Sequence, residues 1–265
     1  MHITVRPETG MWLDVDVAGS GEPMLLVQGM SAHRGMWGKR FLGSLRGEFD
    51  VATYDHRGIA GSAPAHEPFT VADLASDAIA LLDALGWKSA HVVGTSMGGM
   101  VAQELCLLAP ERVRSVVLGC TTAGGPGGVH GPGAFRLVEA IASRNAERAM
   151  QTAFEVNVSA DFARRPGGLQ RFVAASSARR VPAAVVELQA AACLAHDTSA
   201  RLGEFEPRAA VLHGSEDQMI PPSEGARLAE RIPGASYEEW AGVGHLFWWE
   251  RPGEAAAFVT AHAKA

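Results

Sequence analysis

The stretch Ala90-His91-Val92-Val93-Gly94-Thr95-Ser96-Met97-Gly98-Gly99-Met100-Val101-Ala102 decides the predicted fold. An apolar, β-branched run ends at Gly94, and the glycines after Ser96 lead into the helix-like run 100–109. We therefore expect a strand, a sharp turn and a helix. The five residues 94–98 fit the pattern G-x-S-x-G, which is known as the nucleophile elbow.

The elbow gives its serine a chemical role. Small residues two places either side of Ser96 let a strand and a helix close around a strained turn, which lifts the hydroxyl clear of the backbone. The first N–H groups of the helix favour a developing oxyanion there. Ser96 is therefore the predicted nucleophile. The alternative is an ordinary turn in which Ser96 only caps the helix, so the rest of the chain has to supply its partners.

Composition narrows the class of protein. The 265 residues are 47% hydrophobic, enough for the core of one α/β domain. A net charge of −6 without a basic block argues against a nucleic-acid partner. Neither a signal peptide nor a membrane-spanning run is evident, so we expect a soluble, cytoplasmic protein with no membrane partner. Self-association is left open.

The cysteines point to the same compartment. Cys106, Cys120 and Cys193 are far apart, odd in number and embedded in apolar sequence. This spacing is not that of a disulfide framework, and it contains no C-x-x-C redox or zinc pair. We expect buried, reduced thiols and no metal site.

Strand and helix patterns alternate along most of the chain. A turn at 7–10 joins the first two predicted strands into an antiparallel edge hairpin. Helical patterns separate most of the later strands, which is typical of a parallel sheet with right-handed crossovers. One helix is predicted over residues 37–45, and another begins after a cap-like Thr70 with an acid, Asp73, three residues on. The fold class is therefore α/β. The predicted strands cover residues 2–5, 11–17, 24–27, 51–54, 90–94, 113–118, 209–213 and 236–240.

The alternation stops after residue 121. A glycine-rich, hinge-like stretch at 123–133 precedes a long segment of helical composition with no obvious strand. We predict a core domain of residues 1–123 and 207–265, with 124–206 inserted as a helical cap whose helices lie within 135–197. Some apolar cap residues could line a pocket, although at helical spacing they more often pack the cap on the core. They are Phe135, Leu137, Ile141, Met150, Phe154 and Phe172.

A serine nucleophile requires a base that is itself oriented by a carboxylate. Ser96, Asp217 and His245 occur in the Ser, Asp, His order that this elbow requires. The last two each follow a predicted strand, so they should lie at the same sheet edge as Ser96. Glu216 is a rival acid, but the spacing after Gly214 favours Asp217.

The choice of base rests on position. His245 is the histidine that lies in a glycine-flanked loop after the last strand. His91 and His213 fall inside predicted strands, and we expect both to be structural. Asp55 and Arg57 also lie near the sheet's carboxyl edge. We expect them to form a structural ion pair or turn that braces neighbouring loops, not to act in catalysis.

A second loop can supply an oxyanion donor. Gln28-Gly29-Met30-Ser31 follows the strand 24–27 at its carboxyl end, where open α/β sheets place their ligand crevices. Gly29 would free the backbone to turn the next N–H toward the crevice. We predict the Met30 and Met97 N–H groups as the two oxyanion donors. A plain loop with Gly29 in a left-handed turn is the alternative.

These motifs resemble those of the α/β-hydrolase superfamily over almost the whole chain. The matching segments are Gly-Thr-Ser-Met-Gly-Gly, Asp-His-Arg-Gly-x-x-Gly-Ser, Gly-Ser-Glu-Asp and Gly-Val-Gly-His. The chain looks most like the small bacterial esterase, lactonase and perhydrolase branch, which includes enol-lactonases and polyketide methyl esterases. The resemblance implies a mostly parallel eight-stranded sheet flanked by helices, with an inserted helical cap. It also supports the roles given above to Ser96, Asp217, His245, Met30 and Met97.

Two departures from the family pattern are visible. Gln28-Gly29 stands where many relatives have His-Gly, and Ala60 replaces a common glycine in the Asp-x-Arg-Gly loop. Neither touches the triad, but Gln28 adds an amide to the site and leaves the substrate preference open.

The expected activity is hydrolysis of a small carboxylic ester or lactone with an apolar portion, through an acyl-enzyme and without a metal or organic cofactor. Dehalogenase and epoxide hydrolase chemistry are disfavoured, because those enzymes have a carboxylate where this chain has Ser96. Perhydrolysis or cofactor-free oxygenation on the same scaffold is the alternative. A non-enzymatic ligand-binding homologue is less favoured, because all three triad residues are present.

Overall fold

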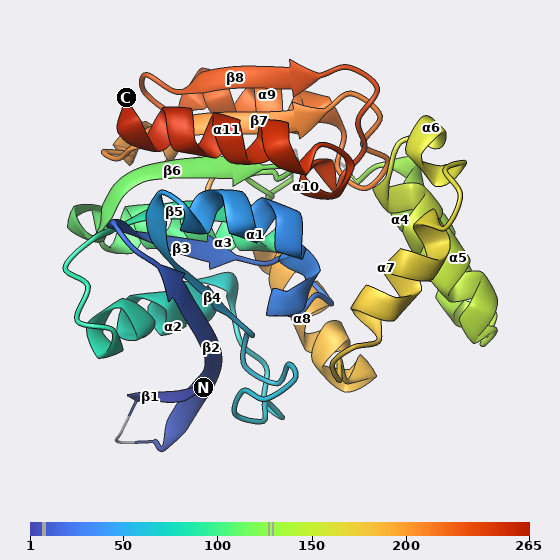
Figure 1. The fold of residues 1–265 in the computed structure, drawn as a ribbon, viewed down its shortest axis with the longest axis horizontal. Coiled ribbons are helices and arrows are strands. Elements are labelled where there is room, and N and C mark those ends of the chain that lie inside the picture. The colour runs from blue at the N-terminus through green and yellow to red at the C-terminus, as the bar shows by residue number, and fades with distance from the viewer. Residues whose placement is uncertain (7–8, 127, 129) are drawn as a thin grey trace.

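The computed structural model describes residues 1–6, 9–126, 128 and 130–265. Its centre is an eight-stranded sheet with the order β1-β2-β4-β3-β5-β6-β7-β8 (Figure 1). β1 and β2 form an antiparallel hairpin, β2 pairs antiparallel with β4, and the remaining pairs are parallel. The predicted α/β fold with a mostly parallel sheet is confirmed.

Of the turn predicted at 7–10, Pro7 and Glu8 lie outside the described residues. The strands are β1 (His2–Arg6), β2 (Met11–Gly19), β3 (Glu22–Val27), β4 (Phe49–Tyr54), β5 (Ala90–Thr95), β6 (Val113–Gly119), β7 (Arg208–Gly214) and β8 (Ser236–Trp240).

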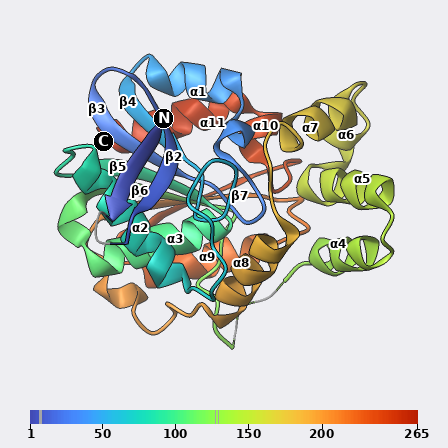
Figure 2. The same cartoon turned by 90° about the horizontal axis from the view of Figure 1, so that it is seen from below.

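Helices cover both faces of the sheet, as Figure 2 shows. One layer contains α1 (Lys39–Arg46), α10 (Phe247–Glu250) and α11 (Pro252–Lys264). The opposite layer contains α2 (Val71–Ala84), α3 (Met97–Leu108) and α9 (Pro222–Arg231).

β3 shows why the sheet is buried on both sides. Met24 and Leu26 belong to the hydrophobic cluster under α1 and α11. Leu25 and Val27 belong to the cluster under α2 and α3. Successive side chains of a strand point to opposite faces, so a continuous apolar run serves two cores.

Helix starts follow local sequence signals. Thr70 and Asp73 form the capping box of α2 that the sequence predicts. The helix expected from Trp37 instead begins at Lys39, after a short 3-10 helix over Arg34–Trp37. Gly38, with φ 75°, separates the two because few other residues adopt this backbone conformation.

The segment between β6 and β7 forms helices beside the sheet, on the right of Figure 1. Apart from an isolated bridge between Gly124 and Asp197, its described residues form no β-structure. Gly127 and Val129 of the hinge-like stretch lie outside the described residues. The division into core and cap at 124 and 206 stays a prediction. The helices are α4 (Pro132–Ala142), α5 (Ala146–Asn157), α6 (Ala160–Ala163), α7 (Gly168–Ser176) and α8 (Ala183–Ala195).

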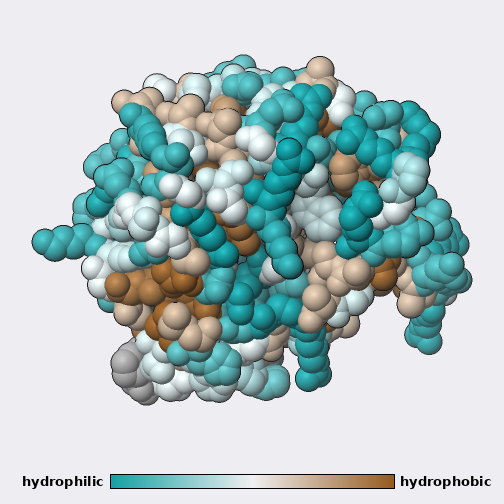
Figure 3. Space-filling view, in the orientation of Figure 1, coloured by the Kyte–Doolittle hydropathy of each residue, from teal (hydrophilic) through white to brown (hydrophobic). Residues whose placement is uncertain are grey.

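The surface is mainly polar on the face shown in Figure 3, where hydrophilic residues surround separate hydrophobic patches. Within the part of the chain that the structure describes, no helix is both long and apolar enough to cross a membrane.

Candidate active site

Ser96 lies in a strained turn between β5 and α3, with φ 56° and ψ −124°. The glycines on either side of it permit this turn. A Cβ on Gly94 would lie 2.1 Å from the Gly98 carbonyl oxygen, and a Cβ on Gly98 would lie 2.1 Å from the Val27 carbonyl oxygen. Only glycine at these two positions allows β5, the elbow and the end of β3 to approach one another this closely.

The end of β6 holds the elbow in place. The Ser96 N–H donates to the Gly119 carbonyl over 2.9 Å, and the Thr121 hydroxyl donates to the Ser96 carbonyl over 2.8 Å. The Ser96 hydroxyl makes no hydrogen bond with any described residue. The backbone of Ser96 is thus fixed while its oxygen is available to a ligand or a base.

The structure brings Asp217 and His245 together at this sheet edge. His245 Nδ1 lies 2.7 Å from Asp217 Oδ2, and both side chains are buried. Burial alone would raise the pKa of Asp217. The charge of protonated His245 and the N–H groups of His213 and His245 outweigh it, so the pKa lies below its usual range. His245 Nε2 has no hydrogen-bond partner among the described residues.

Cys120 connects this pair to the elbow. It follows Gly119, and its Sγ, an Asp217 oxygen and a His245 nitrogen all lie within 4.8 Å of one another. Burial raises the pKa of the Cys120 thiol well above its usual range, and the Asp217 charge adds to this. We assign no metal to these three residues, because the Asp217 carboxylate already accepts the His245 Nδ1–H.

His213, which we expected to be structural, also contacts the candidate acid. Its Nε2 lies 3.1 Å from Asp217 Oδ2. The sequence contains one signal of this contact, which is the four-residue spacing of the two side chains across the turn after β7.

Glu216, the rival acid, has a different partner. Its side chain accepts a hydrogen bond from the Ala160 N–H over 2.9 Å, at the start of α6. The residue is exposed, whereas Asp217 is buried against His245. The structure therefore places Asp217, and not Glu216, beside the candidate base.

The two predicted oxyanion donors lie in segments that contact each other. A Cβ on Gly29 would lie 3.1 Å from Ser96 Cβ, so the loop after β3 lies against the elbow. The Gly29 N–H donates to Gln28 Oε1, and the Ser31 N–H donates to Gln189 Oε1. The Met30 N–H between them has no partner among the described residues.

Met97 occupies the first position of α3, where backbone N–H groups lack a partner within the helix. Gln28 is buried beside this region, and its backbone carbonyl accepts a hydrogen bond from His56 Nε2 over 2.9 Å. The Gln28 side-chain nitrogen is buried and unpaired within the described chain. The oxygen of the Gln28 amide is therefore paired with the Gly29 N–H, while its nitrogen has no partner among the described residues.

Asp55 and Arg57 brace loops, but they do not pair with each other. Arg57 forms two hydrogen bonds of 2.7 Å with Asp77 on α2. Asp55 accepts the Arg34 N–H over 2.6 Å and lies 3.2 Å from Arg179, in the segment between α7 and α8. Both residues have structural partners, as expected, but each has its own.

The loop that carries His245 is hydrogen-bonded to the segment where α5 ends and α6 begins. Glu250 Oε1 accepts hydrogen bonds from the N–H groups of Gly244 and Ser159, each over 2.8 Å. The Leu246 N–H donates to the Asn157 carbonyl, also over 2.8 Å. The end of α5 and the start of α6 therefore support the backbone on both sides of His245.

A cavity of about 430 Å³ lies between the loop after β3 and the helices α4, α5 and α7. Of the apolar cap residues considered above, Phe154 is buried in the core, whereas Phe135 and Ile141 are exposed. The cavity's larger apolar side chains are Met30, Met36, Leu137, Met150, Phe172 and Leu246.

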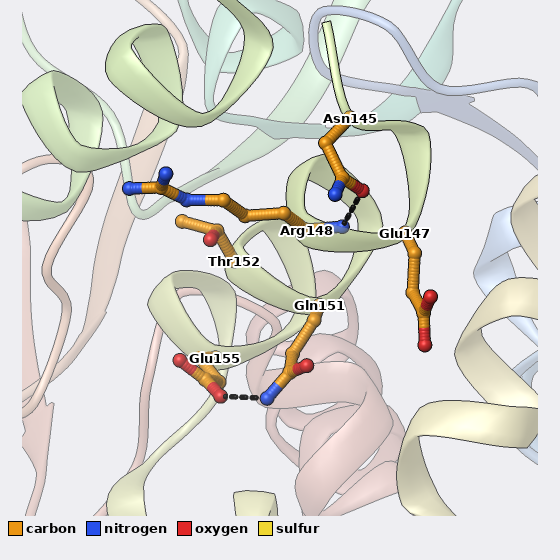
Figure 4. Close-up of a pocket in the computed structure, with 6 residues that line it drawn as sticks. All are labelled: Asn145, Glu147, Arg148, Gln151, Thr152 and Glu155. Carbon is orange, nitrogen blue, oxygen red and sulfur yellow. Dashed lines mark hydrogen bonds between the residues drawn. The ribbon is translucent and has the colours of Figure 1, made fainter. Parts of the chain in front are cut away.

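A second hollow, of about 310 Å³, lies on α5 and is lined by polar residues (Figure 4). Asn145 caps the helix there and Gln151 donates to Glu155, so these groups satisfy one another. None of the lining residues belongs to the candidate site, and we assign this hollow no function.

Comparisons with known proteins agree with this architecture. Residues 22–252 match the family described as alpha/beta hydrolase fold. A putative carbamate hydrolase RutD from Caulobacter segnis is 32% identical over 240 residues, which cover 87% of this chain and 86% of the relative. A putative non-heme bromoperoxidase BpoC from Mycobacterium tuberculosis is 28% identical over 261 residues, or 91% of this chain and 93% of that protein.

Among solved structures, the enol-lactonase from Burkholderia xenovorans LB400 superposes with a TM-score of 0.85. It is 23% identical, and the match covers 100% of both chains. At this identity the likeness establishes the fold alone. Together with the family match, these similarities show that the chain belongs to the alpha/beta hydrolase fold family and is a hydrolase.

Proposed function

We propose that the protein hydrolyses a carboxylic ester or lactone through Ser96, His245 and Asp217. One observation carries the proposal. The buried Asp217–His245 pair, with 2.7 Å between Oδ2 and Nδ1, lies within 4.8 Å of Cys120 Sγ, and Cys120 follows Gly119, whose carbonyl accepts the N–H of Ser96 in the elbow. A nucleophile, a base and an acid that orients the base are the groups that acyl transfer requires.

In the first half of the reaction, Ser96 Oγ attacks the carbonyl carbon while His245 Nε2 takes its proton. Asp217 holds the imidazole through Nδ1 and stabilises its positive charge. The Met30 and Met97 N–H groups bind the oxyanion of the tetrahedral intermediate. Collapse of this intermediate breaks the bond to the alcohol oxygen, which receives the proton from His245.

In the second half, water attacks the acyl-Ser96 carbonyl and gives its proton to His245. The same two N–H groups bind the second oxyanion. The bond to Ser96 Oγ then breaks, His245 returns the proton to this oxygen, and the carboxylic acid leaves. Atoms and charges balance without a further reagent.

The substrate class follows from the cavity beside Met30. Its apolar lining favours a hydrophobic acyl or alcohol portion, because such groups gain free energy on leaving water. The relative named a carbamate hydrolase supports attack on a carbonyl carbon bonded to a heteroatom.

The test compares the wild type with Ser96→Ala on p-nitrophenyl acetate and p-nitrophenyl octanoate. We expect kcat/KM to fall by at least about a thousandfold, and labelling by a fluorophosphonate to disappear. Ser44→Ala is the control, because the Ser44 hydroxyl only binds the Arg40 carbonyl within α1. Full turnover by the Ser96→Ala variant would disprove the proposal.

Perhydrolysis is the second candidate, and the relative named a putative non-heme bromoperoxidase favours it. Here hydrogen peroxide, instead of water, would attack the acyl-Ser96 carbonyl and release a peracid. Peracid formation from an ester and hydrogen peroxide, measured by bromide oxidation, separates the two reactions. Hydrolysis without detectable peracid would exclude this candidate.

A further inference from the structure

His213, near the end of β7, is a completely buried histidine that the mechanism above does not use. Its Nε2 lies 2.9 Å from the Ile220 carbonyl oxygen and 3.1 Å from Asp217 Oδ2. Both neighbours are acceptors, since a carbonyl oxygen cannot donate and Asp217 is ionised at its lowered pKa. Nε2 must therefore carry the proton, which it donates to the Ile220 carbonyl while it faces Asp217 Oδ2.

The other side of the ring shows that this orientation is held by packing. His213 Nδ1 has no hydrogen-bond partner among the described residues, although it is buried. A Cβ on Gly225 of α9 would lie 2.5 Å from Nδ1, so the helix closes this side of the ring. Leaving a buried nitrogen unpaired costs free energy. The packing of α9 nevertheless holds the ring in the orientation that points Nε2 at Asp217.

The carboxylate of Asp217 is surrounded by donors. Oδ1 accepts the N–H groups of Met219 over 2.8 Å and Ile220 over 3.0 Å. Oδ2 accepts Nδ1–H of His245 over 2.7 Å and also lies 3.1 Å from His213 Nε2. Asp217 Oδ2, the oxygen that orients the candidate base, therefore lies between two imidazoles.

Other titratable groups lie on the surrounding elements. Cys120 at the end of β6 is held protonated by burial and the Asp217 charge. On α9, Glu224 accepts the Thr122 hydroxyl, and on β8 the Tyr237 hydroxyl donates to Glu239. Glu224 and Tyr237 therefore have partners of their own. Cys120 Sγ and His213 Nε2 both approach Asp217, and His213 Nε2 lies 3.1 Å from Oδ2.

We propose that His213 is a positioning residue for the Asp217–His245 pair, in which its Nε2–H fixes Asp217 Oδ2 and limits the negative charge that this oxygen offers to His245. The inference rests on the proposed function. Without His213, Oδ2 would interact with protonated His245 alone and stabilise it more strongly. The Asp217 carboxylate would also lose one of the N–H groups that fix the orientation of its plane.

Three variants test this role with p-nitrophenyl acetate as the probe. His213→Gln can place an amide N–H near the position of Nε2, whereas His213→Asn is too short and His213→Leu has no donor. We expect His213→Leu and His213→Asn to lower kcat by about tenfold with little change in KM. The acid limb of their kcat/KM profile should move upward by about half a pH unit. His213→Gln should restore most of both properties.

His91→Leu is the matched control, because His91 is a buried strand histidine that binds Ser115 and Glu22 instead of the triad. It should lower the melting temperature and leave the pH profile unchanged. The low-field proton NMR signal of His245 Nδ1–H gives a second readout, which should shift in His213→Asn but not in His91→Leu.

The inference is wrong if His213→Asn and His213→Gln have the same pH profile and NMR signal as the wild type, whatever their melting temperatures. If His213→Leu does not fold, the comparison of Asn with Gln decides the question. Ser96→Ala, assayed in parallel, separates the two claims. Loss of turnover in Ser96→Ala with unchanged profiles in the His213 variants overturns only the role of His213. Retained turnover in Ser96→Ala overturns the proposed function and this role with it.

Discussion

Glu250 Oε2 accepts a hydrogen bond from the Ser159 hydroxyl over 2.6 Å, although the two residues are 91 positions apart in the chain. Through this contact the loop that carries His245 is joined to the start of α6. Because Glu250 Oε1 also accepts the Gly244 N–H, one carboxylate binds both the His245 loop and the start of α6.

Removing this carboxylate should loosen the candidate base. We predict that Glu250→Ala lowers kcat for p-nitrophenyl acetate by about tenfold, because the Gly244 and Ser159 N–H groups lose a charged acceptor. Glu250→Gln keeps an acceptor and should lose much less. Glu254→Ala, an exposed acid in the next helix, is the control and should match the wild type. Equal activity of Glu250→Ala and Glu254→Ala would contradict the prediction.

Gly29 should be intolerant of a side chain for reasons of space. We predict that Gly29→Ala lowers kcat/KM by about tenfold and that Gly29→Val abolishes activity, because Cβ would lie 3.1 Å from Ser96 Cβ. Circular dichroism should show both variants folded. In Gly43→Ala, a Cβ meets no atom within 4 Å, so this helical variant should be fully active. A fully active Gly29→Val enzyme would rule out the oxyanion role of this loop.

The cavity should set the preferred length of the substrate. Leu137 lines it, whereas the next residue, Val138, is exposed. We predict that Leu137→Trp lowers kcat/KM for p-nitrophenyl octanoate by about tenfold, while activity on the acetate changes little. Val138→Trp should leave both substrates unaffected. If Leu137→Trp reduces activity on both esters equally, the cavity does not bind the acyl chain.

The ionised state of Asp217 should make stability depend on pH. Its pKa is lowered in the folded protein, whereas the pKa of an aspartate in the unfolded chain is about 3.9. Its contribution is therefore complete above about pH 5 and is lost as the pH falls through the lowered folded value. Asp217→Asn should reduce the free energy of unfolding by about 1 kcal/mol more at pH 7 than at pH 3, measured in urea. Asp161→Asn, at an exposed carboxylate, should show no such difference.

Much of the fold was predictable because its signals are local. The apolar run before Gly94 and the helix pattern after it predict the elbow, and Thr70 with Asp73 predicts the start of α2, as the structure confirms. α1 begins at Lys39 instead of Trp37, because Gly38 adopts a positive φ. Helical periodicity in the sequence does not reveal this backbone conformation. The side chains around the candidate site were harder to predict. His213 and Arg57 were expected to be structural, but their partners, Asp217 and Asp77, could not be inferred from position in the chain.

By itself, the sequence determined the order of strands and helices, the elbow around Ser96 and the sheet edge at which Asp217 and His245 would lie. These follow from backbone periodicity and from the rule that loops after parallel strands share one edge. Only the tertiary structure decided that His213 lies beside the Asp217 oxygen and that Glu250 joins the His245 loop to the start of α6. It also decided which residues of the segment between β6 and β7 line the cavity. Such contacts depend on side-chain rotamers and on the distance between segments remote in sequence, and no local pattern encodes either.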